Sequence, residues 1–135
     1  MSERFDRGQA IMNQVLGAGH AEAVRERIGA ISPDFADYIV AAGFGEVYAR
    51  PGLSLPQRQL LNVGVLTAIG GAEPQLGNHI RGALRVGVTA TEIVEAIFHV
   101  ALYAGHPRAV SAFRVATEVF AELGVTADAG GPGQH

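Results

Sequence analysis

Apolar residues recur at three- and four-residue spacing along most of this chain, and this periodicity is its strongest structural constraint. No segment of the 135 residues alternates convincingly between apolar and polar positions, as a half-buried β-strand would. Helix-start signals stand at Ser32-Pro33, at Ser54 to Gln57 and at Thr89 to Glu92. The sequence therefore predicts an all-α fold in one domain.

The predicted helices follow one another with short breaks. They cover about residues 4–17, 21–28, 33–49, 54–69, 73–89, 90–104 and 108–123. The helix over 54–69 is so apolar (LLNVGVLTAIG) that we expect it to be buried on nearly all sides. Residues 1–125 form the predicted helical domain. The small, Gly- and Pro-rich residues 126–135 are expected to be a disordered tail.

The balance of apolar and charged residues predicts association between copies of the chain. Apolar residues make up 48% of the sequence and charged residues only 17%, more apolar surface than a small domain hides alone. The net charge is −3 and the basic residues are scattered, so we expect no nucleic-acid partner. The polar N-terminus and the lack of a long apolar run predict a cytoplasmic protein without a membrane segment.

The sequence contains no cysteine, which excludes disulfides, thiolate metal sites and thiol-based redox chemistry. Its five histidines form neither an HxxxH pair nor an HExxH motif. A metal site built from neighbouring residues is therefore not expected.

His79 is the histidine with the most suggestive surroundings. On the predicted helix Glu73–Thr89 it shares a side with Gln75 and several small residues, whereas Arg81 and Arg85 fall on the opposite side. A single histidine on an apolar face is more often a hydrogen-bonded core residue than a catalyst. The small neighbours, however, leave space for another helix, a partner subunit or a substrate, and both interpretations stay open.

Two charged residues near the middle of the chain, Glu46 and Arg58, have two interpretations each. Glu46 falls on the apolar face of the predicted helix over 33–49, where a carboxylate is costly unless it is paired or used. It either pairs with Arg50 at i+4 or stands beside a pocket. Arg58, at the start of the most apolar helix, either extends to water or anchors a substrate carboxylate.

A narrow polar stripe runs along the helix predicted over 90–104. It consists of Glu92, Glu95, His99 and Tyr103 at helical spacing, without a lysine or arginine. The stripe is either a solvated face or the border of a pocket or interface. His20, at the start of the helix over 21–28, is a cap or surface residue unless a neighbouring subunit covers it.

Four segments together resemble one protein family over nearly the whole chain, from about Arg4 to Val125. They are RFDRGQAIMNQVLGAGHAE, GEVYARPGLSLPQRQLL, NHIRGALRVGVTATEIVEAIFHVALYAGHPRA and FRVATEVFAELGV. The chain resembles the 4-carboxymuconolactone decarboxylase family, within the alkyl hydroperoxidase D-like superfamily. This resemblance implies a compact bundle of about six helices that forms a homo-oligomer, a trimer or a hexamer built as a trimer of dimers.

The resemblance also implies the chemistry. Redox members of the superfamily carry a CxxC motif before the histidine that corresponds to His79, and here those positions are Ala72 and Gln75, so the chain is not expected to be a thiol peroxidase. The decarboxylases use neither cofactor nor metal and act on a carboxylated γ-lactone. The implied catalytic residues are His79, Glu46 and Arg58. The implied substrate-binding residues are Arg50, Gln75, His99, Tyr103 and His20.

Within that resemblance each residue has an expected role. His79 protonates carbon or stabilises the developing oxyanion, and Arg58 with Arg50 holds the carboxylates of the substrate. Glu46 sets the protonation state of His79 or donates a proton itself. His99 and Tyr103 form the pocket wall, and His20 comes from a partner chain.

Gln75 departs from the family pattern, because typical decarboxylases carry a glutamate there. Glutamine keeps a hydrogen bond but removes the charge, so His79 is expected to be a weaker acid. This departure leaves a second hypothesis, a related enzyme that rearranges or modifies a ring or lactone in a biosynthetic pathway. A third hypothesis is a non-catalytic helical oligomer whose polar residues are interface ion pairs.

Overall fold

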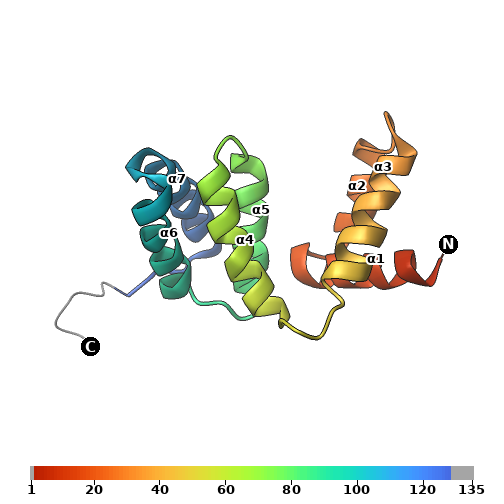
Figure 1. Cartoon of the computed structure of the whole chain (residues 1–135), viewed down its shortest axis with the longest axis horizontal. Coiled ribbons are helices and arrows are strands. Elements are labelled where there is room, and N and C mark those ends of the chain that lie inside the picture. The colour runs from red at the N-terminus through yellow and green to blue at the C-terminus, as the bar shows by residue number, and fades with distance from the viewer. Residues whose placement is uncertain (1, 129–135) are drawn as a thin grey trace. The chain divides into compact units, whose positions relative to one another are not determined.

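The computed structural model describes residues 2–128, and every regular element in that range is helical (Figure 1). The elements are α1 (Glu3–Leu16), α2 (His20–Arg27), α3 (Pro33–Tyr38), the π-helix η1 (Ile39–Val47), α4 (Leu55–Ile69), α5 (Glu73–Arg85), α6 (Ala90–Ala104) and α7 (His106–Leu123). The all-α prediction is confirmed. Of the predicted tail, residues 126–128 have no regular structure and residues 129–135 lie outside the described range. None of the described helices is long and apolar enough to cross a membrane.

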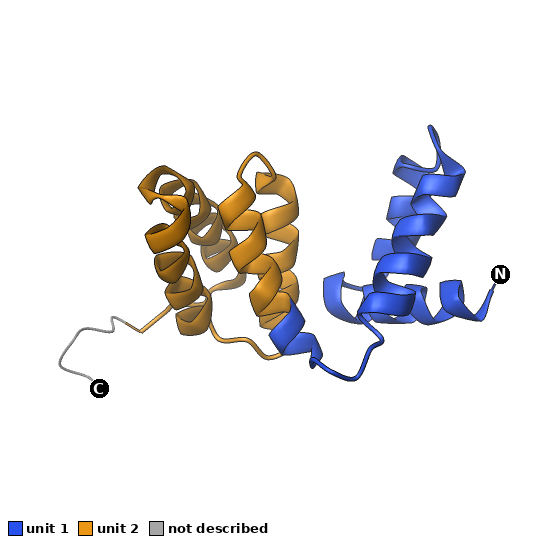
Figure 2. Ribbon diagram, in the orientation of Figure 1, with its two compact units in different colours: residues 1–58 blue, residues 59–135 orange. Residues whose placement is uncertain are grey.

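The chain divides into two compact units, residues 1–58 and residues 59–135 (Figure 2). The division falls within α4, between Arg58 and Gln59.

Unit 1 is organised by close packing of α1 against η1. A methyl group on Gly8 would collide with the carbonyl oxygen of Val40, and one on Gly45 would collide with that of Arg4. Two glycines thus let the two helix backbones approach more closely than any larger residue would allow. Around this contact the unit buries a core that includes Phe5, Met12, Val15, Val24, Val40 and Phe44.

The helix predicted over 33–49 begins as expected and then changes type. Ser32 Oγ accepts from the Phe35 backbone N–H at 3.2 Å, so Ser32 is the N-cap. From Ile39 the chain is π-helical, and the Tyr48 N–H donates to Gly43 O, five residues back, at 3.0 Å.

This wider helix overturns the predicted inward position of Glu46. The buried residues of η1 are Val40, Ala41, Phe44 and Gly45, whereas Glu46 and Val47 are exposed. The prediction assumed 3.6 residues per turn, and i→i+5 hydrogen bonding changes which residues share a face.

Unit 2 packs α5, α6, α7 and most of α4 around one apolar core. Its fully buried members include Val63, Ile80, Ile93 and Ile97, one or more from each of three helices, and α7 adds Ala112, Ala116 and Val119. The predicted capping box is present: Thr89 Oγ1 accepts from Glu92 N, and Glu92 Oε1 accepts from Thr89 N. The last helix begins at His106, two residues earlier than predicted, with Pro107 in its first turn.

The prediction that the helix over 54–69 is buried on nearly all sides is wrong for the single chain. Leu61, Val65 and Ile69 follow one another at i+4 spacing and are 55%, 48% and 57% exposed. On α6, Phe98 and Leu102 are 67% and 73% exposed. Unit 2 therefore carries large apolar side chains that its own core does not cover.

The α1–η1 contact can be tested with a matched pair of glycine variants. In Gly8→Ala the methyl group meets the Val40 carbonyl, so we expect the free energy of unfolding to fall by about 1–3 kcal/mol. Gly43→Ala, on η1, meets nothing within 4 Å and should show no such loss. The measurement is denaturant unfolding at one protein concentration. Equal losses in both variants would contradict the close approach.

Candidate active site

His79 lies on α5 and is partly buried, in direct contact with a buried amide from α4. Gln59 is fully buried, and its Nε2 lies 3.1 Å from His79 Nδ1. The same Nε2 donates to the backbone carbonyl oxygen of His79 at 3.2 Å. Asn62 Nδ2 donates to Gln59 Oε1 at 3.0 Å, which completes a short chain of side-chain amides leading to the imidazole. The ring is therefore held in one orientation by hydrogen bonds from α4.

Sequence reasoning did not identify Gln59. The sequence feature that could have identified it is a pair of polar residues, Gln59 and Asn62, three positions apart in a largely apolar stretch of the helix. A buried amide there must be hydrogen-bonded, which makes it a structural or functional element. Its partner, however, lies 20 residues away in the sequence.

Arg58 and Arg50 lie together at the start of α4 and in the preceding turn. Arg58 Nη2 donates to the Arg50 backbone carbonyl at 3.0 Å. Arg58 Nε is buried and has no hydrogen-bond partner among the described residues. A buried donor without a partner costs about 1–3 kcal/mol. An acceptor such as a carboxylate or a water oxygen at this position would recover that energy.

Glu46 pairs with Arg4 of α1, whereas a pair with Arg50 was one of the two alternatives left open by the sequence. Glu46 Oε1 accepts from Arg4 Nη1 at 2.7 Å, and both side chains are about half exposed. Next to this pair, Arg7 Nε donates to the Gly45 carbonyl at 2.8 Å. Both arginines come from α1, 38 to 42 positions before their partners. No local pattern reveals a pairing at that separation.

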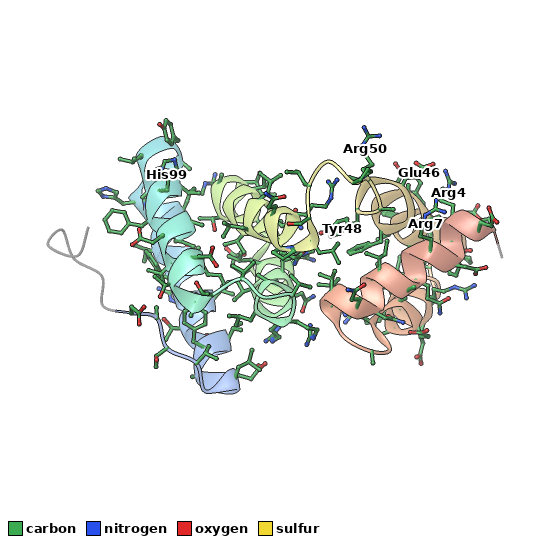
Figure 3. All side chains as sticks on the ribbon, turned by 90° about the horizontal axis from the view of Figure 1, so that it is seen from below. Arg4, Arg7, Glu46, Tyr48, Arg50 and His99 are labelled. Carbon is green, nitrogen blue, oxygen red and sulfur yellow. The ribbon has the colours of Figure 1, made fainter. Side chains whose placement is uncertain are left out.

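These residues border an open cleft in unit 1. Its volume is about 530 Å³, and it is lined by Arg7, Gly45, Glu46, Val47, Ala49 and Arg50. The labelled side chains of Arg4, Arg7, Glu46 and Arg50 gather at this part of the unit (Figure 3). Two arginines facing one carboxylate leave a net positive charge, which suits an anionic ligand.

The remaining candidate residues lie elsewhere. Gln75 is exposed in the first turn of α5, and His20 is the first residue of α2. His99 and Tyr103 are exposed neighbours on α6, with ring centroids 5.6 Å apart at 45°. In the single chain, the polar stripe predicted over residues 90–104 is therefore an exposed face of α6. Glu92, one of its members, closes the capping box.

Arg81, which was predicted to lie on the side of α5 opposite His79, pairs with a carboxylate of α7. Its Nε and Nη2 donate to the two carboxylate oxygens of Glu122 at 2.8 and 3.0 Å. These hydrogen bonds lower the pKa of Glu122 and raise the pKa of Arg81. This cation is therefore committed to a protein carboxylate rather than to a ligand near His79.

The structure thus describes two groups of candidate residues in separate units. Glu46, Arg50 and Arg58 belong to unit 1, and His79 and Gln75 belong to unit 2. The meeting of His79 with Glu46 and Arg58 around one substrate stays a prediction. Among residues 2–128, no cluster of three or more His, Asp or Glu side chains could hold a metal ion.

Comparison with known proteins decides the family. A family model described as the carboxymuconolactone decarboxylase family matches residues 33–118. This chain belongs to that family. It is 37% identical over 123 residues to the 4-carboxymuconolactone decarboxylase of Acinetobacter baylyi, covering 91% of each chain. It is also 35% identical over 119 residues to the nitrosuccinic acid decarboxylase of Metarhizium robertsii, covering 88% of this chain and 82% of the relative.

The range that matches the carboxymuconolactone decarboxylase family contains every candidate residue except His20. It also contains Gln59, whose amide contacts His79, and Asn62, which donates to Gln59. Arg4 and Arg7 lie before it.

The role of Glu46 can be separated from that of its ion pair. Because the Glu46–Arg4 pair is half exposed, we expect Glu46→Gln and Arg4→Gln each to change the free energy of unfolding by no more than about 1 kcal/mol. Denaturant unfolding measures this directly. If Glu46 takes part in catalysis, Glu46→Gln alone should lower decarboxylase activity. Equal activity losses in the two variants would assign Glu46 only to the ion pair.

Proposed function

We propose that this protein is a cofactor-free carboxy-lyase that acts on a small carboxylated lactone or a closely related acid. Its membership of the carboxymuconolactone decarboxylase family and its two decarboxylase relatives support this function. The observation that carries the proposal at the level of the site is His79, partly exposed and held by the buried Gln59. An imidazole fixed in this way is suited to act on a bound substrate.

The chemistry of such a reaction explains which groups are needed. When CO2 leaves, the electron pair of the broken carbon–carbon bond moves to an electron-accepting group, and negative charge develops on its oxygen. A positioned donor stabilises that oxygen, which is the proposed role of His79. Afterwards the substrate carbon takes up a proton.

The two named relatives point to a shared principle. In 4-carboxymuconolactone the electron pair can reach the lactone oxygen through the conjugated double bond. In nitrosuccinic acid it can move directly onto the nitro group next to the carboxylate. Both acids therefore develop negative charge on an oxygen and carry a second anionic group. The assay substrates for this protein are accordingly 4-carboxymuconolactone first and nitrosuccinic acid second.

Arginines of unit 1 are proposed to bind the carboxylates of the substrate. Arg58 Nε has no hydrogen-bond partner among the described residues, and Arg58 Nη2 donates to a backbone carbonyl rather than to a protein carboxylate. Both observations support binding of a substrate carboxylate by this guanidinium. Arg50 in the open cleft is proposed to bind a second carboxylate. Gln75, His99 and Tyr103 are proposed to border the same pocket, and Glu46 is proposed to act on His79.

The ring-rearranging alternative depends on Gln75, which removes a charge that typical decarboxylases carry. It predicts arginines that pair with protein acids and are unavailable to a ligand, because an unpaired charge beside an apolar, neutral substrate is costly. Among the described residues Arg58 is hydrogen-bonded to a carbonyl, which favours the decarboxylase.

We also propose that the protein is a cytoplasmic homo-oligomer, a trimer or a hexamer built as a trimer of dimers. The exposed apolar side chains on α4 and α6 support association, because single-chain proteins rarely leave so many large apolar residues uncovered. His20 is proposed to enter the active site of a neighbouring subunit.

Decarboxylation can be measured directly. The purified protein should release CO2 from 4-carboxymuconolactone, and His79→Ala should lower kcat by about 10²–10⁴-fold because a positioned donor or acid is lost. His106→Ala is the control, since His106 is an exposed first residue of α7 outside the candidate site. Full activity of a folded His79→Ala protein would overturn the assignment. Absence of CO2 release from both acids would overturn the proposed reaction.

The oligomer can be tested on α4. Val65→Lys places a charge in the exposed apolar stripe, so light scattering should show a smaller assembly than the wild type, in multiples of 14.1 kDa. Ala121→Lys, exposed on α7, is the matched control. A wild-type protein that is already monomeric would contradict the proposed assembly.

A further inference from the structure

We propose that Gln59 is a positioning residue that holds His79 as the neutral tautomer with its proton on Nε2. His79 then serves as a hydrogen-bond donor to the substrate oxygen and is not the acid that protonates carbon. This inference rests on the proposed decarboxylase function only for its consequence in the reaction. The tautomer itself follows from contacts among three side chains of unit 2.

The contact with the His79 backbone determines the orientation of the Gln59 amide. One end of this side chain lies 3.2 Å from the backbone carbonyl oxygen of His79. A carbonyl oxygen can only accept a hydrogen bond, so the atom facing it must be the amide nitrogen. The opposite orientation would place two acceptor oxygens against each other at that distance.

A second contact agrees with this orientation. Asn62 Nδ2 donates to Gln59 Oε1 at 3.0 Å, so the oxygen end of the Gln59 side chain is also occupied. Gln59 is fully buried, and reversing its amide would disrupt both hydrogen bonds without water to replace them. The buried amide therefore has one strongly preferred orientation.

The orientation of the Gln59 amide determines which nitrogen of the His79 imidazole carries the proton. Gln59 Nε2 carries two hydrogens; one points to the His79 carbonyl, and the other is available to Nδ1 at 3.1 Å. Nδ1 can accept that hydrogen only if it carries no proton itself. The neutral ring then has its proton on Nε2. A doubly protonated ring would place N–H against N–H, because both facing nitrogens would be donors.

In the proposed reaction, His79 acts only as a hydrogen-bond donor. The carbon–carbon bond to the carboxylate breaks, and its electron pair moves to the acceptor oxygen, which receives a hydrogen bond from His79 Nε2–H. That proton stays on His79, because losing it would leave an imidazolate. The carbon takes its proton from water, the CO2 is released, and the resulting hydroxide passes to the solvent. A neutral imidazole that acts as an electrophilic donor is an established catalytic device in other enzymes.

The direct test is nitrogen NMR of the wild-type protein labelled with ¹⁵N-histidine, at neutral pH and without substrate. We expect His79 Nδ1 to give the signal of an unprotonated ring nitrogen and Nε2 that of a protonated one. A His79→Asn sample identifies the signals among the five histidines. A proton on Nδ1, whether in the other tautomer or in an imidazolium, would overturn the inference.

Gln59→Glu tests the cause. A carboxylate can only accept from Nδ1, so Nδ1 should become protonated in this variant, in the other neutral tautomer or in an imidazolium. We expect the Nδ1 signal to change to that of a protonated ring nitrogen and kcat to change with it, because the neutral ring with its proton on Nε2 is no longer the favoured form. Gln57→Glu is the matched control: it adds the same charge two residues earlier, on an exposed side chain whose capping box with Ser54 accepts glutamate. It should leave both tautomer and kcat unchanged.

Gln59→Met supplies a second variant if the buried glutamate prevents folding. It fills similar space without a donor, so the fixed tautomer should give way to a mixture of both. An unchanged single tautomer in Gln59→Met would overturn the role of Gln59. The NMR result does not depend on turnover. A His79 Nε2–H tautomer in a protein that releases no CO2 would support the positioning role and overturn only the proposed reaction. CO2 release with a proton on Nδ1 would overturn only the inference.

Discussion

The buried amide of Gln59 is the interaction on which the surroundings of His79 depend. It can sit in an apolar environment only because each end is hydrogen-bonded, to Asn62 on its own helix and to His79 on α5. Val63 of α4 and Leu76 and Ile80 of α5 belong to one buried apolar core, and Gln59 is itself fully buried. Packing and polar satisfaction therefore act together, because the shared core and the buried amide both join α4 to α5.

A different constraint shapes unit 1. The glycine contacts between α1 and η1 bring two backbones together, and the π-helical segment begins one residue before Val40, whose carbonyl faces Gly8. The π-helix places Phe44 and Gly45 inward and leaves Glu46 outward beside Arg4. The cleft with Arg7 and Arg50 is lined by the last residues of this segment, Gly45, Glu46 and Val47. Such segments often occur at functional sites, where they redirect side chains.

Local signals in the sequence predicted most helix starts, because capping involves residues only three positions apart. Ser32, Ser54 and Thr89 cap the helices that they were expected to cap. The π-helix was not predictable in this way, since its residues also suit an α-helix and only tertiary packing selects the wider form. The pairs Gln59–His79 and Arg4–Glu46 lie 20 and 42 residues apart, so no periodicity within one helix reveals them. The exposed stripe of α4 was missed because an apolar sequence does not tell its own core from an intermolecular contact.

The glutamines at positions 75 and 59 both favour a neutral His79. An ionised glutamate close to the imidazole would favour its charged form, and glutamine at position 75 cannot do so. The hydrogen that Gln59 Nε2 directs toward His79 Nδ1 likewise opposes a second proton on the ring. A neutral histidine donor makes few demands on the chemical nature of the oxygen that it stabilises, because no proton is transferred and the proton affinities need not match. A donor of this kind can therefore serve a lactone oxygen or a nitro oxygen, and in the proposed function the distinction between substrates is left to Arg50 and Arg58.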